Sequence, residues 1–318
     1  MLPAHQLRPL VILLLSLLPI LAAGGGAYIL RQDIPIAPGA RLLVALLIEA
    51  AIFFAAGSLA ARERLSKLPP IALATALTAL TALTWLIAGT GELWHGAAAT
   101  IAAAIIAFWY LAAPKNNGSD ILLLAIYGAI ALGKLSSLCY PAAWPKAPNA
   151  IIGEVAWLRT LLLTVLITRA PANVNFGFFP SKREWLIGVK WFLCFLPIAF
   201  LIPLRTLNPE PAKIALAVVG TFVGHFVFVA LREEFLFRGM MLPRLQHWLG
   251  ATGGLAATCV VFGLTHLPFG QFPNWKFVAV ATVAGWFYAK AYLEGQGIRA
   301  AMVTHALTNV VARVFLAA

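Results

Sequence analysis

Apolar residues run in long blocks along almost the whole chain, and polar residues gather in the short segments between these blocks. A helix needs about 20 mostly apolar residues to cross the hydrocarbon core of a bilayer, and most of the blocks approach this length. The block Leu255–His266 is short unless its helix begins upstream near Ala251. The pattern therefore predicts an all-α, polytopic membrane helix bundle with about 10–11 transmembrane helices. The blocks are Leu10–Leu30, Leu42–Ala61, Leu68–Ala88, Ala97–Ala113, Ile121–Leu138, Ile151–Thr168, Trp185–Leu204, Ile214–Leu231, Leu255–His266, Phe277–Leu293 and Ala300–Leu316.

The composition excludes several classes of protein. Of the 318 residues, 62% are apolar and only 11% are charged, whereas a soluble domain has about 45–50% apolar and about 25% charged residues. So much apolar surface does not fit inside one globule, which excludes a soluble enzyme and a disordered chain. The net charge of +12 comes from basic residues that stand singly or in small groups between apolar blocks. This distribution is typical of loops beside anionic headgroups and not of nucleic-acid binding.

We therefore expect an integral, multi-pass protein that is surrounded by membrane lipid and has no nucleic-acid partner. We expect its location to be the inner or plasma membrane of a bacterium.

The chain changes character near residue 180. Residues 1–180 are rich in Ala and Leu and nearly free of charge inside the blocks, so we expect an amino-terminal multi-span membrane region. The exceptions include Glu49 and Arg159, for which we expect pairing or a place at a helix end. The segment 171–182 is the best candidate for a linker. In residues 181–318, polar side chains interrupt apolar helices, and this region is where we expect the chemistry.

Two adjacent carboxylates, Glu233 and Glu234, follow an apolar helix, and Arg238 comes four residues after the second. Charges inside a membrane are costly and persist where function or pairing retains them. On a helix, Glu234 and Arg238 are neighbours and can pair. Glu233 points about 100° away from Glu234 and is available for another role. The alternative is a charged helix end that reaches toward the membrane surface.

Two further motifs each bring a histidine into an apolar helix. Phe262-x-x-x-His266 closes one block, and His305-x-x-x-Asn309 places two polar side chains on one helical face, one turn apart. Taken separately, His266 fits a structural role at a helix end, and the pair His305 and Asn309 fits a contact between membrane helices. Together with Glu233, they supply a base, imidazoles and an amide donor, which are the groups needed to add water to an amide carbonyl. The chain contains neither a GxSxG nucleophile elbow nor an HExxH zinc motif.

In this order, the three motifs resemble those of the type II CAAX-prenyl-protease-like intramembrane proteases, also called the Rce1-type or CPBP family. The stretch Gly285–Lys290 also resembles the glycine and aromatic helix of that family. The resemblance covers roughly residues 215 to 312. It implies a helical membrane bundle that acts as an endopeptidase near the membrane surface on a membrane-associated or lipid-modified protein or peptide.

The resemblance also implies a role for each motif residue. Glu233 would activate the attacking water, and His266 would share that role. His305 and Asn309 would stabilise the oxyanion of the tetrahedral intermediate. The supporting residues would be Glu234, Arg238 and Phe262.

Alternatives to a metal-free protease remain open at this point. Glu233, His266 and His305 are side chains of the types that hold a catalytic zinc ion. The resemblance favours an enzyme without a metal or another cofactor, because the better-studied relatives look glutamate-dependent. A non-catalytic membrane partner or immunity protein on the same scaffold is a second alternative. A transporter with a polar midplane site is a third, although no inverted repeat is evident.

Overall fold

The computed structural model describes residues 8–31, 33–89, 91–132, 135–141, 149–168, 179–200, 211–269 and 272–316. Within these residues every regular element is a helix, and no strand occurs among them. The chain divides into two compact units, residues 1–170 and 171–318. This division falls ten residues before the boundary expected at residue 180, and most of the expected linker 171–182 falls outside the described residues.

Long apolar helices confirm the expected all-α membrane bundle, so the chain is an integral membrane protein. In the described part of the chain, five helical stretches are long and apolar enough to cross a membrane. The other apolar blocks form helices as well. The five stretches are 14–31, 36–57, 70–88, 93–112 and 217–264.

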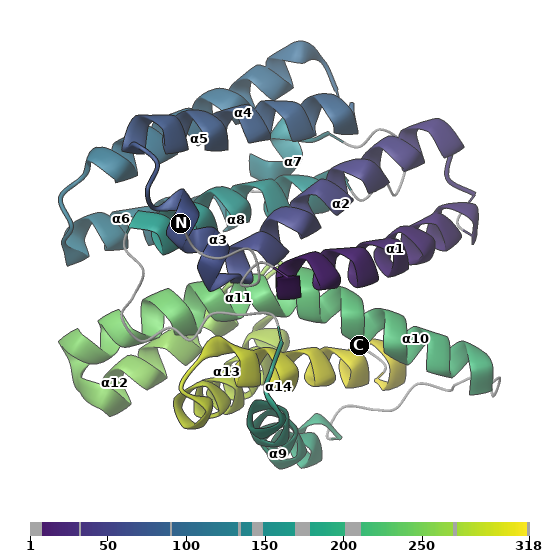
Figure 1. Cartoon of the computed structure of the whole chain (residues 1–318). Helices are drawn as coiled ribbons and strands as arrows, with labels where there is room; N and C mark the ends of the chain where they lie inside the picture. Colours follow the sequence, from purple (N-terminus) through teal and green to yellow (C-terminus); the bar gives the residue numbers. More distant parts are fainter. Residues whose placement is uncertain are drawn as a thin grey trace. The chain divides into compact units, whose positions relative to one another are not determined.

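The amino-terminal unit is built from helices whose ends the sequence marks locally (Figure 1). Helix α4 has Pro70 at its first position and ends at Gly89, whose φ of 62° is left-handed. Both residues are typical of these places, since proline lacks an N–H that a helix start leaves unpaired and glycine adopts positive φ without strain. Arg41 of α2 donates to the last carbonyls of α4, those of Leu86 and Ile87, each at 3.0 Å. The elements are α1 (Arg8–Arg31), α2 (Ile36–Gly57), α3 (Leu59–Leu65), α4 (Pro70–Ala88), α5 (Leu93–Ala112), α6 (Asn117–Leu132), α7 (Leu135–Cys139) and α8 (Asn149–Thr168).

A fully buried ion pair joins α2 and α8 inside this unit. Arg159 Nε lies 2.8 Å from Glu49 Oε2, and neither side chain is exposed. The Arg159 guanidinium also donates to the Leu77 carbonyl at 3.3 Å and to Thr81 Oγ1 at 3.1 Å, both on α4. A buried charge is tolerated only with a partner and further hydrogen bonds, and this arginine has both. The pairing expected for these two charges is confirmed.

The carboxyl-terminal unit contains the helices that carry the three motifs (Figure 1). Helix α12 bends at Gly250, where φ is 73°, so an uninterrupted α-helix begins again at Ala251. The short block Leu255–His266 therefore belongs to a helix that starts upstream near Ala251. Asn274 caps the amino terminus of helix α13, because its side-chain oxygen accepts a hydrogen bond from the Phe277 N–H at 3.0 Å. The elements are α9 (Lys182–Ala199), α10 (Pro211–Gly224), η2 (His225–Ala230), α11 (Leu231–Glu234), η3 (Phe235–Met241), α12 (Leu242–Leu264), α13 (Trp275–Gly295), α14 (Ile298–Val310) and η4 (Val311–Phe315).

Three of these elements, η2, η3 and η4, are π-helical. The segments η2 and η3 enclose the single α-helical turn α11, and η4 follows α14 directly. Because π-helical segments are rare and recur at functional sites, their position beside the first and third motifs is informative. Glu233 and Glu234 therefore lie on a single α-helical turn between two π-helical segments.

Apolar side chains from four helices form the core of this unit beneath the motifs. Aromatic side chains dominate this core, and they pack edge to face, as Phe237 and Phe262 do at 5.1 Å. Such packing leaves little freedom for the polar groups that lie above it. The buried members are Phe195, Ala199, Phe237, Phe262, Ala281, Ala284, Tyr288 and Leu316.

Candidate active site

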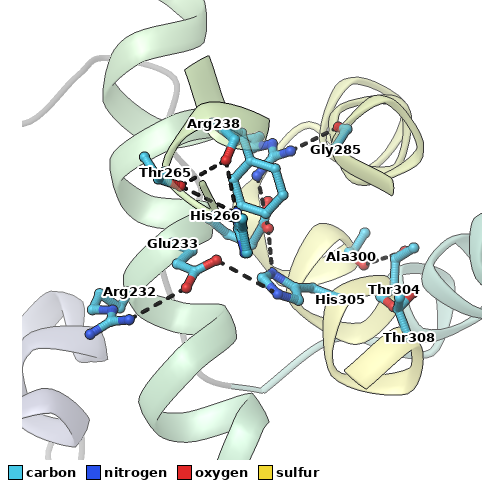
Figure 2. A network of polar contacts seen from close by, with 12 residues as sticks. Arg232, Glu233, Arg238, Thr265, His266, Gly285, Ala300, Thr304, His305 and Thr308 are labelled. Atoms are coloured by element: carbon cyan, nitrogen blue, oxygen red, sulfur yellow. Dashed lines mark hydrogen bonds and ion pairs between the residues drawn. The ribbon is translucent and has the colours of Figure 1, made fainter. Parts of the chain in front are cut away.

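Glu234 and Arg238 form the contact predicted from their four-residue spacing. Arg238 Nη1 lies 3.0 Å from Glu234 Oε1, and both side chains are fully buried. Arg238 Nη2 donates to the Gly285 carbonyl at 2.7 Å, which ties the motif to α13 (Figure 2). The guanidinium also lies over the rings of Phe262, at 4.6 Å, and Tyr288, at 5.3 Å. Charge, hydrogen bonds and aromatic faces therefore all hold this arginine in one place.

His305 links the third motif to both carboxylates of the first. Its Nδ1 lies 2.8 Å from Glu234 Oε1, and its Nε2 lies 3.8 Å from Glu233 Oε2 (Figure 2). The ring stacks on Tyr288, with centroids 4.4 Å apart and planes 16° apart. An ionised carboxylate only accepts hydrogen bonds, so Nδ1 donates to Glu234 and Nε2 is the nitrogen that faces Glu233.

Glu233 has room to accept a proton or a water hydrogen. Its side chain is 16% exposed, and Oε1 lies 3.4 Å from Arg232 Nη2. Within the described residues, Oε2 of Glu233 and Oε2 of Glu234 accept no hydrogen bond. A buried carboxylate oxygen without a donor is costly and is typical of functional positions. Of the two acids, only Glu233 is partly exposed, so it is the one that a water molecule can reach.

His266 lies in the turn just after the end of α12. Its Nδ1 is 2.9 Å from the Phe262 carbonyl, which can only accept, so Nδ1 carries a hydrogen. In the neutral ring Nε2 is then a free acceptor. Figure 2 shows the rings of His266 and His305 beside the Glu233 carboxylate, and His266 interacts electrostatically with Glu233. The second motif thus places one imidazole with a basic nitrogen near the same acid.

Among the described residues, Asn309 is the one predicted catalytic residue with no bond to the other motif residues. It lies on α14 one helical turn after His305 and is partly buried. Among the described residues it makes no hydrogen bond or ion pair with the other motif residues. The contacts therefore gather Glu233, Glu234, Arg238 and His305, bring His266 close to this group, and show no bond from Asn309.

Two residues that support the site were not assigned a role from the sequence. Tyr288 provides the flat surface on which His305 stacks, and Gly285 provides the carbonyl for Arg238. They are three residues apart and so share one face of α13. The signal that points to them is the resemblance of the stretch Gly285–Lys290 to a family helix, but an apolar helix alone does not distinguish a supporting tyrosine from a core residue.

We expect Gly285→Ala to lower the free energy of unfolding by about 1–3 kcal/mol, the usual range for overpacking a core. A Cβ at this position would lie 2.9 Å from Phe262 Cδ1 and 3.2 Å from Arg238 Nη2. The matched control is Gly220→Ala in α10, where nothing lies within 4 Å of the new atom. Chemical denaturation of the solubilised protein measures both variants. Equal stability of the two would show that α13 does not approach Arg238 this closely.

In the part of the chain that the structure describes, no group of three His, Cys, Asp or Glu residues is placed to hold a metal ion. We therefore derive no step through a metal ion.

Comparison with known families matches residues 215–311 to the model described as Rce1-like, type II CAAX prenyl endopeptidase. This stretch is about a third of the chain and includes all three motifs. Neither the curated proteins nor the solved structures contain a match. The resemblance drawn from the motifs is therefore confirmed for residues 215–311, which match the Rce1-like type II CAAX prenyl endopeptidase family, a family of proteases.

Proposed function

We propose that this protein is an intramembrane endopeptidase in which Glu233 activates water. The observation that carries the proposal is the group formed by Glu233 and Glu234 of α11, Arg238 of η3 and His305 of α14. Intramembrane ionisable groups with specific partners are typical of functional sites. The match of this part of the chain to a protease family supports the same conclusion.

In the proposed mechanism, water is held between Glu233 and the scissile carbonyl. Glu233 takes one proton while the water oxygen bonds to the carbonyl carbon, and His266 shares this role through its free Nε2. The oxyanion that forms is stabilised by donors on α14, namely His305 Nε2 and the Asn309 amide. The C–N bond then breaks, and the proton held by Glu233 passes to the leaving nitrogen.

The hydrogen bond to Glu234 sets a condition on His305. Since Nδ1 already donates to Glu234, Nε2 can donate to an oxyanion only when the ring carries both protons. Glu234 faces Nδ1 of this ring at 2.8 Å and Glu233 faces Nε2 at 3.8 Å. Glu234 and Arg238 therefore act as positioning residues in the proposal, and they do not contact the substrate.

The proposed substrate is a membrane-associated or lipid-modified protein or peptide in the inner or plasma membrane of a bacterium. Full-length protein in liposomes tests this with two peptides of one sequence, one carrying a prenylated cysteine near its carboxyl terminus and one without the prenyl group. Mass spectrometry of the products identifies the cleaved bond. Hydrolysis of either peptide by the wild type, but not by Glu233→Gln, supports the proposal. If the wild type cleaves neither peptide nor a wider set of membrane-anchored peptides, a non-catalytic partner protein is the better interpretation.

We expect cleavage to survive exhaustive chelation, and we expect purified protein to carry no stoichiometric zinc. The reason is that no group of three His, Cys, Asp or Glu side chains among the described residues is placed to hold a metal ion. Metal analysis of the chelated protein, together with its cleavage rate before and after zinc is added back, decides the matter. Activity that is lost on chelation and restored by zinc, with loss of metal in His266→Ala and His305→Ala, would establish the zinc-dependent version instead.

A further inference from the structure

Helix α9 lies outside the part of the chain that matches the protease family, yet it packs against both α13 and α14 (Figure 1). Its start is fixed by a capping box, in which Ser181 Oγ accepts from the Glu184 N–H and the Glu184 carboxylate accepts from the Ser181 N–H. The sequence therefore marks the start of this helix locally. The family match ends at residue 311 and begins at residue 215, so it gives α9 no role.

Helices α9 and α14 approach each other closely at Gly188. The Thr304 hydroxyl, which is fully buried, donates to the Gly188 carbonyl at 2.9 Å and also lies 3.1 Å from the Ala300 carbonyl oxygen of its own helix. A Cβ on residue 188 would lie 2.6 Å from Val303 Cβ and 2.8 Å from the Ala300 carbonyl oxygen. Only glycine allows the two backbones to approach this far. Because Thr304 directly precedes His305, this contact constrains the position of α14 along its axis and its rotation about that axis at the point where His305 is attached.

Polar contacts at the start and in the middle of α9 attach it to α14 and α13. At the start, Arg299 Nε donates to Glu184 Oε1 at 2.8 Å, with Glu184 almost fully buried. Farther along, Lys190 and Trp191 both donate to the Glu294 carboxylate, at 2.7 and 2.8 Å. The first contact reaches α14 and the second reaches α13. Three separate points of attachment therefore prevent α9 from sliding or rotating against these two helices.

The apolar side of α9 continues into the core below the motifs. Phe195 is buried in the same cluster as Phe237, Phe262 and Tyr288, and its ring lies 5.6 Å from that of Phe287. Phe262 and Tyr288 are the rings that hold Arg238 and His305. A shift of α9 is therefore transmitted to the surfaces on which the site residues rest.

We propose that α9 is part of the catalytic unit, and that the bond from Thr304 to Gly188 positions His305 against Glu234 and Glu233. The expected effect on the cleavage rate rests on the proposed function, whereas the expected effect on the position of the His305 ring does not. Thr304 and Gly188 are positioning residues, because their own atoms reach only the protein. The family-matched segment alone, without α9, then lacks the support that sets its third motif.

Thr304→Val tests the proposal, because valine keeps the shape of threonine and removes the hydroxyl. With the full chain in liposomes and the peptide that the wild type cleaves, we expect kcat to fall about 10- to 100-fold, as for a catalytic group displaced by roughly an ångström. We expect KM to stay near the wild-type value. Thr304→Ser keeps the hydroxyl and should retain most of the rate. The matched control is Thr258→Val, since the buried Thr258 hydroxyl donates only to the Gly254 carbonyl of its own helix.

A second measurement does not depend on catalysis. The imidazole nitrogen signals of His305 in protein labelled with ¹⁵N-histidine, assigned with His305→Gln, report its bond to Glu234. We expect these signals to shift in Thr304→Val and to keep their wild-type positions in Thr304→Ser and Thr258→Val. If the wild type cleaves no peptide, the proposed function fails and the His305 signals alone decide whether α9 positions the ring.

Gly188→Ala provides a second variant in case Thr304→Val folds poorly, and its control is Gly220→Ala, where the added Cβ meets open space. We expect Gly188→Ala to shift the His305 signals and lower kcat, and Gly220→Ala to do neither. Unchanged His305 signals and unchanged kcat in Thr304→Val, or in Gly188→Ala, would overturn the proposal.

Discussion

Replacing Glu233 with glutamine is expected to lower the rate of peptide cleavage by at least about 10²–10⁴-fold, the usual contribution of a positioned base. Glutamine keeps the size of the side chain but accepts no proton from water. We expect the free energy of unfolding to change little, because a neutral amide is easier to bury than a carboxylate, and because Oε2 of Glu233 accepts no hydrogen bond within the described residues. Single-turnover cleavage and chemical denaturation of the same preparation measure both quantities.

The control for this variant is Glu63→Gln, the same change at a half-buried carboxylate of the amino-terminal unit. It should keep the wild-type rate. A Glu233→Gln protein that cleaves its substrate as fast as the wild type would remove Glu233 from the mechanism and, with it, the main chemical argument for hydrolysis.

The largest loss of stability is expected for Arg238→Ala, at about 3–5 kcal/mol, the range measured when one partner of a buried ion pair is removed. Arg238 is fully buried and donates to both Glu234 and Gly285. Its removal leaves the Glu234 carboxylate with His305 as its remaining partner, and it leaves the Gly285 carbonyl without this donor. The variant should therefore unfold at lower denaturant and lose activity together.

Arg183→Ala, at an exposed position near the start of α9, is the matched control and should change stability by no more than about 0.5 kcal/mol. An Arg238→Ala protein as stable as this control would mean that Arg238 faces water and is not enclosed between Phe262 and Tyr288. Purified yield alone does not decide this, so the denaturation midpoints must be compared.

The sequence predicted those features that depend on local spacing. The contact between Glu234 and Arg238 follows from a four-residue interval on a helix, and it is present at 3.0 Å. The helical character of the chain follows from the length of its apolar blocks. The pairing of Glu49 and Arg159 follows from the cost of a charge among apolar residues, although the sequence alone does not say which charges meet.

Features that depend on contacts between distant helices were not predicted. The stacking of His305 on Tyr288 and the close approach at Gly188 bring together positions 17 and 116 residues apart, and an apolar helix in a membrane has little periodicity that would mark them. The π-helical segments beside the first motif were also not predicted, because the spacing of apolar and polar residues does not mark a widened helical turn. The sequence indicated a helix start near Ala251 only because the apolar block Leu255–His266 is too short to cross a membrane by itself.

The pair between Glu49 and Arg159 has a consequence for how the chain enters the membrane. The two residues are 110 positions apart, and Glu49 is synthesised first. Helix α2 is long and apolar enough to cross a membrane, so it carries a carboxylate into the bilayer before α8 exists. Until α8 arrives, this carboxylate must stay protonated, hydrated or sheltered by the insertion machinery, because no cation of its own unit is yet available in the Arg159 position. Assembly of the amino-terminal unit is therefore complete only after α8 has been inserted, and in every earlier intermediate Glu49 lacks its partner Arg159.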